Sequence, residues 1–145
     1  MTTVNVSAPA VEANDPVSGF QEVVSFPHGL PGFTDCHGFV LFAAETANFQ
    51  WLTAVDGPPA SFLTVDPRHV VPTMKCNLTP RDMERLQAKP ETPLLWLAIV
   101  LVEADGTVCV NLRAPIVINP AAMIGFQIMP ERSLWPVRHV IARGE

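Results

Sequence analysis

Histidine, cysteine and acidic side chains are the residues of this sequence that could bind a metal ion or transfer a proton. Cys36 and His37 are adjacent, and adjacent residues of a strand point to opposite faces, so they do not share an ion easily. Asp66 and His69 could act as an acid-base pair, but no serine or cysteine nucleophile elbow accompanies them. No glycine-rich phosphate loop occurs either. We therefore predict no enzyme activity, no metal site and no cofactor.

A second chemistry, recognition of another protein, is indicated by residues 108–119, where apolar side chains recur at every second position. This alternation predicts one continuous strand with one face on the core and the other facing water or a partner. Pro115 cannot donate a backbone hydrogen bond, so the strand should lie on an edge or be bulged near Pro115. Asn111, Arg113 and Asn119 would form a partner-facing polar row. The alternative is that they are ordinary solvated residues, with Asn119 ending the strand.

The C-terminal segment provides a second candidate patch in Trp135, Arg138 and His139. Tryptophan and arginine are frequent anchors of protein interfaces. The alternative is that Trp135 belongs to the core and Arg138 pairs with a carboxylate. Gln127 lies between two apolar residues of a predicted strand, so we expect its amide to make a structural hydrogen bond.

Composition points to a single mainly β domain. The 145-residue chain is 48% apolar, and its 15 prolines are scattered, which favours many short elements joined by fixed turns. The net charge of −5 disfavours a nucleic-acid binder and favours a basic protein partner. Three distant cysteines suit reduced thiols, and the longest apolar run, 94–102, is too short to span a membrane. We expect a cytoplasmic protein.

The order of elements supports this fold class. We predict a flexible tail over residues 1–17, a single domain over 18–145, and one surface helix after Thr79, with Pro80 and Asp82 forming its capped start. The turn at 27–32 should let Leu30 and Phe33 plug into the core. The predicted strands cover residues 20–26, 39–43, 50–55, 61–65, 94–102, 108–119, 125–129 and 135–141. This pattern predicts an all-β (mainly β), small β-barrel-like domain.

Four segments in fixed order carry a family resemblance. They are Phe26-Pro27-His28-Gly29-Leu30-Pro31-Gly32-Phe33, Phe49-Gln50-Trp51-Leu52, Val110-Asn111-Leu112-Arg113-Ala114-Pro115-Ile116-Val117-Ile118-Asn119 and Trp135-Pro136-Val137-Arg138-His139. Together they resemble the flagellar assembly factor FliW family, over residues 20–141. Trp135 stands where family members commonly carry tyrosine.

The resemblance implies a small antiparallel β-barrel-like cytoplasmic protein, monomeric when free, that binds the translational repressor CsrA and, alternatively, flagellin. It implies that CsrA is held by an allosteric, non-competitive route so that flagellin messenger RNA is translated, and that accumulating flagellin takes the factor back. Two alternatives stay open. One is a flavin-binding split barrel, whose purified protein would be yellow, and the other is a flagellin chaperone that does not bind CsrA.

Overall fold

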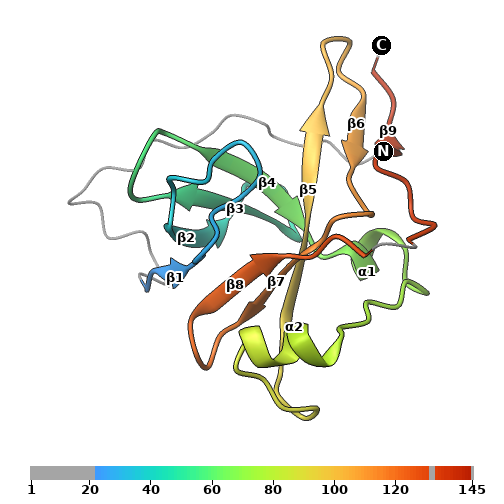
Figure 1. Cartoon of the computed structure of the whole chain (residues 1–145). Coiled ribbons are helices and arrows are strands. Elements are labelled where there is room, and N and C mark those ends of the chain that lie inside the picture. The colour runs from blue at the N-terminus through green and yellow to red at the C-terminus, as the bar shows by residue number, and fades with distance from the viewer. Residues whose placement is uncertain (1–21, 131–132, 145) are drawn as a thin grey trace.

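The computed structural model describes residues 22–130 and 133–144. Its longest strand, β5 (Leu95–Val102), pairs with β4, β7 and β6 and so connects the rest of the sheet to the β6–β9 pair. Figure 1 shows β5 crossing the molecule from helix α2 at one end to a hairpin at the other. The nine strands pair in the order β4-β3-β2-β1-β8-β7-β5-β6-β9. The other elements are β1 (Val24–Ser25), β2 (Gly38–Ala43), β3 (Phe49–Ala54), β4 (Ser61–Val65), α1 (Pro67–Val70), α2 (Pro80–Arg85), β6 (Val108–Val110), β7 (Ile116–Asn119), β8 (Ile124–Gln127) and β9 (His139–Ala142).

Seven of these strands close into a ring. β4 pairs with β3 on one side and with β5 on the other, where Val65 lies opposite Ala98. The pairs are antiparallel except β1 and β8, which run parallel with Ser25 opposite Ile124. β6 and β9 extend from the second half of β5, outside the ring. The mainly β prediction is confirmed.

Three apolar cores fill the two sides of the curved sheet. The inner core lies inside the ring and contains Val24, Phe26, Leu30, Cys36, Phe39, Leu52, Leu97, Ile116 and Ile118. Alternate residues of the same strands point outward into two other cores. The β9-side core contains Phe49, Trp51, Leu63, Val65, Met74, Ala98, Val100, Val108, Val110 and Leu112. The helix-side core, next to α2, contains Leu86, Trp96, Val117, Phe126 and Ile128.

The predicted continuous strand over residues 108–119 is wrong, because it is two strands, β6 and β7, with a bulge between them. Both pair with β5, yet five residues (111–115) separate Val110 from Ile116 while only two (98–99) separate their partners Val100 and Leu97. Three extra residues therefore bulge out, as the alternative prediction near Pro115 required. Neither strand is an edge strand, because β6 also pairs with β9 and β7 with β8.

An odd number of extra residues reverses the side to which alternate positions point. Val108 and Val110 face the β9-side core before the bulge, whereas Ile116 and Ile118 face the inner core after it. Val117 consequently lies in the helix-side core. The prediction that the odd-numbered residues meet water or a partner is therefore wrong for four of them, which are buried: Cys109, Pro115, Val117 and Asn119.

Local signals predict the start of α2. The Thr79 side chain accepts a hydrogen bond from the Asp82 backbone N–H, the Asp82 carboxylate accepts one from the Thr79 backbone N–H, and Pro80 occupies the first turn. The prediction of a single helix is wrong, because Pro67–Val70 forms a second short helix capped by Asp66. The Asp66-Pro67 pair was an available signal. Neither helix in the described residues is long and apolar enough to cross a membrane.

The remaining predicted elements mostly match. Ser61–Val65 has the predicted bounds, and the other strands differ by a few residues at their ends. Of the predicted strand at 20–26, only Val24–Ser25 is a strand, and its start lies outside the described residues, as does the predicted tail over 1–17. Leu30 is 1% exposed, and the ring of Phe33 meets that of Phe62 edge to face at 5.3 Å. The plug at this turn is confirmed.

Gly29→Ala should destabilise the protein more than Gly32→Ala. Both glycines have positive φ, which costs an alanine about 1 to 2 kcal/mol. A Cβ at Gly29 would also lie 2.5 Å from the Phe33 carbonyl oxygen, whereas one at Gly32 would meet nothing within 4 Å. The added crowding should cost about 1 to 3 kcal/mol more, measured by urea denaturation. Equal losses would contradict this account of the turn.

Candidate protein-binding surface

The bulge and the C-terminal segment meet at the surface. The Asn111 side-chain oxygen accepts hydrogen bonds from the backbone N–H groups of Arg113 and Ala114, at 3.0 and 3.2 Å, which turns the chain outward. The Arg113 Nε then donates to the carbonyl oxygen of Trp135 at 2.9 Å. The Leu112 backbone N–H donates to the carbonyl oxygen of Pro136 at 3.0 Å. Three of the predicted partner-binding residues, Asn111, Arg113 and Trp135, are thereby brought together.

Exposed apolar side chains surround this junction. Leu134 is 97% exposed, and Met129 and Val137 are also exposed. Trp135 is half-buried against the β9-side core, as the alternative prediction for it required in part. A small hollow of about 40 Å³ is lined by Arg113, Ile128, Pro130 and Trp135, among others, so the two neighbours of Met129 in the chain lie beside the bulge. We call Asn111, Arg113, Met129, Leu134, Trp135 and Val137 the bulge surface.

The sequence analysis missed the three exposed apolar residues of the bulge surface. Met129 and Val137 fall within predicted strands, and Leu134 falls just before the last of these strands, so nothing in their spacing distinguishes them from core residues. Large apolar side chains are normally buried, and a group of exposed ones marks an interaction site. Their position shows only in the tertiary structure.

Arg138 makes an ion pair with Glu103. Its Nε and a terminal nitrogen donate to the two carboxylate oxygens at 2.8 and 2.6 Å, and both side chains are exposed. The hydrogen bonds raise the pKa of Arg138 and lower that of Glu103. The alternative prediction, that Arg138 pairs with a carboxylate, is confirmed. The pair closes the β5–β6 hairpin against the segment leading into β9.

Asn119 does not belong to this surface, so its predicted place in a partner-facing row is wrong. Its side chain is buried at 1% exposure. The Nδ2 donates to the carbonyl oxygen of Leu86 at 2.8 Å and to that of Gln87 at 3.3 Å, and the Oδ1 accepts from the Ala121 backbone N–H. Asn119 thus caps the C-terminal end of α2 and fixes the β7–β8 turn.

Gln127 supports the bulge from below. Its Nε2 donates to the carbonyl oxygen of Ala114 at 3.0 Å, which confirms the predicted structural hydrogen bond. Its Oε1 is buried and has no hydrogen-bond partner in the part of the chain that the structure describes. Two side chains therefore fix the backbone of the bulge: Gln127 bonds the carbonyl oxygen of Ala114, and Asn111 bonds the N–H groups of Arg113 and Ala114.

Reactive side chains are dispersed in the described residues. Cys36, Cys76 and Cys109 are free thiols, and burial raises the pKa of each. No group of three histidine, cysteine or acidic side chains lies close enough to hold a metal ion within residues 22–130 and 133–144. What the bulge surface offers is apolar contact area beside hydrogen-bonding groups, and this combination suits recognition of a protein.

Asn119→Ala should lower the free energy of unfolding by about 1 to 3 kcal/mol, because two backbone carbonyls at the end of α2 lose a buried donor. Urea denaturation measures the loss. Asn77→Ala, which changes an exposed asparagine, is the control and should be nearly neutral. A neutral Asn119→Ala would contradict the capping role.

The Glu103–Arg138 pair should make the free energy of unfolding fall at acidic pH. The folded-state pKa of Glu103 lies below its ordinary value of 4.5, so the pair stabilises the fold above that value. Its contribution is lost as the pH falls below 4.5 through the lower folded-state pKa. Glu103→Gln should reduce this loss in urea midpoints between about pH 6 and about pH 3, whereas exposed Glu91→Gln should not. Identical acid profiles for the wild type and Glu103→Gln would contradict the assignment.

Comparisons with known proteins agree with one another. A family model described as FliW protein matches residues 18–141. The flagellar assembly factor FliW of Geotalea uraniireducens (strain Rf4) is 31% identical over 119 residues, covering 81% of this chain and 73% of the relative. That of Moorella thermoacetica is 33% identical over 122 residues, covering 81% and 77%. A crystal structure of the flagellar assembly factor FliW superposes with a TM-score of 0.74 at 31% identity, covering 81% of this chain and 84% of the other.

Proposed function

We propose that this chain, which belongs to the FliW protein family, is a flagellar assembly factor that binds CsrA and flagellin in turn and catalyses no reaction. The partners are those that the family resemblance implies. The observation that carries the proposal is the bulge surface, where Leu134 is 97% exposed beside the joined Arg113 and Trp135. We place the encounter in the cytoplasm and the free protein in a monomeric state.

The energetics of the bulge surface favour binding. Full burial of a leucine side chain contributes about 1.5 to 3 kcal/mol, and Met129 and Val137 add to the apolar area. Arg113 supplies the polar rim. In the described residues its Nε alone has a hydrogen bond, to Trp135, so the rest of the guanidinium remains available to a carbonyl or carboxylate of the partner.

Charge supports CsrA as one partner. The chain carries 14 acidic and nine basic residues, and a protein that binds RNA presents basic side chains to phosphate. Opposite net charges speed and orient the encounter more than they tighten the complex. Added salt should therefore slow association more than it speeds dissociation.

The proposed mechanism is partner switching. CsrA is held at a site other than its RNA-binding face, so flagellin messenger RNA is released and translated. Accumulating flagellin then competes for the chain and frees CsrA. Titration of CsrA with and without target RNA tests the allosteric step. A ternary complex supports it, and strict competition between RNA and this chain contradicts it.

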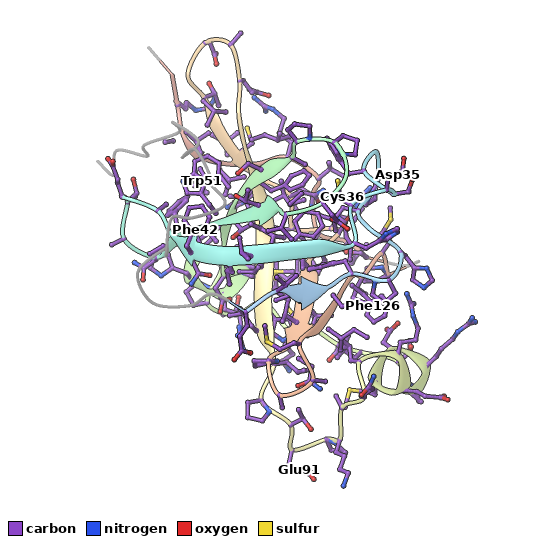
Figure 2. The ribbon with its side chains drawn as sticks, turned by 90° about the vertical axis from the view of Figure 1, so that its left-hand side faces the viewer. Asp35, Cys36, Phe42, Trp51, Glu91 and Phe126 are labelled. Atoms are coloured by element: carbon purple, nitrogen blue, oxygen red, sulfur yellow. The ribbon has the colours of Figure 1, made fainter. Side chains whose placement is uncertain are left out.

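Leu134→Asp and Arg113→Glu should each weaken CsrA or flagellin binding at least about tenfold, equivalent to about 1.4 kcal/mol. Leu134 is almost fully exposed, so its replacement should leave the fold intact. Calorimetry with each partner separately measures the effect. Lys89→Glu is the matched charge control, because Lys89 is exposed in the turn near Glu91, at the bottom of Figure 2.

Each outcome of these titrations has a distinct meaning. Unchanged binding of both partners by Leu134→Asp and Arg113→Glu would remove the bulge surface from the interface. Binding of flagellin without CsrA would identify a flagellin chaperone instead. Equal weakening by Lys89→Glu would show that the effect is not specific to the bulge surface.

A further inference from the structure

β9 is an edge strand with one free side. In the described residues it pairs with β6 alone, through Val110 opposite His139 and Cys109 opposite Val140. An edge strand presents backbone N–H and C=O groups that can pair with another strand. β9 contains no proline and no lysine, arginine or acidic residue, and proline and charged side chains are common means of blocking an edge.

A groove of about 340 Å³ runs beside this strand. Its lining comprises the β9 residues His139 to Ala142, together with His69 and Val70 of α1 and Phe49 at the start of β3. Phe49 is 6% exposed, and the β9 residues are all half-buried. Figure 1 shows β9 and α1 on the same side of β5, away from the ring strands β1 to β3. Strand edge and groove thus form one continuous feature.

The groove marks a place where the β9-side core is incompletely covered. Val70, Ile141 and Ala142 pack against this core but remain partly exposed. In the helix-side core, by contrast, Leu86 directly after α2 is fully buried. Apolar side chains entering the groove would therefore extend an existing core.

The polar lining indicates the charge of the occupant. Two imidazoles, of His69 and His139, line the groove, and no carboxylate does. Arg143 follows β9 directly and is exposed. Each imidazole can donate a hydrogen bond, and Arg143 adds a positive charge to this side of a chain whose net charge is −5, so the groove suits a carboxylate.

We propose that an extended segment of a partner protein adds to β9 as a further strand. Its alternate apolar side chains enter the groove, and an aspartate or glutamate side chain meets His69 or His139. Backbone pairing supplies affinity, and the groove selects the side chains. The inference rests on the proposed function only in that the chain acts by binding proteins, because this surface is separate from the bulge surface.

Synthetic peptides test strand addition directly. The probe is acetyl-Val-Thr-Glu-Thr-Val-Thr-amide, whose valines and glutamate lie on one face of the strand. It is titrated into the full chain and followed by amide chemical shifts of residues 139–142. Two further versions carry N-methyl groups on alternate backbone nitrogens, so that each blocks one edge of the peptide. We expect one version to bind like the parent and the other to bind at least about tenfold more weakly. Equal binding of both versions would contradict edge pairing.

Charge in the groove is tested by His69→Glu, a change at an exposed side chain. This change should weaken binding of the probe at least about fivefold, whereas His37→Glu, in the loop before β2, should not. A probe with lysine in place of glutamate should bind His69→Glu more tightly than it binds the wild type. The inference is overturned if no peptide binds. A groove occupied by a second copy or by the chain's own residues 1–21 would give this result.

These results are separable from the proposed function. Arg113→Glu should leave binding of the probe unchanged while it weakens CsrA or flagellin. Loss of probe binding in Arg113→Glu would contradict two separate surfaces. Failure of the probe together with normal binding of CsrA and flagellin would overturn this inference alone.

Discussion

The pairing of β5 with two successive strands along one edge, separated by a bulge of three extra residues, is the constraint on which the rest of the structure depends. Because three is odd, positions that face the β9-side core in β6 are followed in β7 by positions of the same parity that face the inner core. One strand, β5, can thus close the ring with its first half and carry β6 and β9 with its second half. Without the bulge, Val117 and Asn119 would take the side of the sheet that Ile116 and Ile118 now occupy in the inner core.

The bulge also organises the surface. A chain that leaves a sheet exposes backbone groups that need partners, and here Asn111 and Gln127 satisfy two N–H groups and one carbonyl between them. The outward turn brings Arg113 against Trp135, which positions the C-terminal segment and its exposed apolar residues. Structural and proposed recognition roles therefore meet in neighbouring residues, while Asn119, four positions after Pro115, has contacts within the fold only.

The two proposed interaction surfaces lie at the boundaries of well-packed cores. The inner core is enclosed by strands on all sides, and the helix-side core lies next to α2. Exposed or half-buried apolar side chains gather beside the bulge and along β9, where the β9-side core is only partly covered. A protein that exchanges partners benefits from such sites, because a partner can complete a core without unfolding it.

The sequence by itself determined the features that depend on near neighbours: the mainly β class, the strand over residues 61–65, the capped start of α2 and the turn that places Leu30. These follow from alternation, capping pairs and glycine geometry, which act within a few residues. It also placed Arg113 and Trp135 among the candidate residues, through their types and the family resemblance. Tertiary structure alone decided that alternation across residues 108–119 spans two strands, that Asn119 is buried and that Leu134 is exposed. A two-residue period in the sequence continues unchanged through a bulge with an odd number of extra residues. Only the pairing with β5 shows that the side chains change from one core to another.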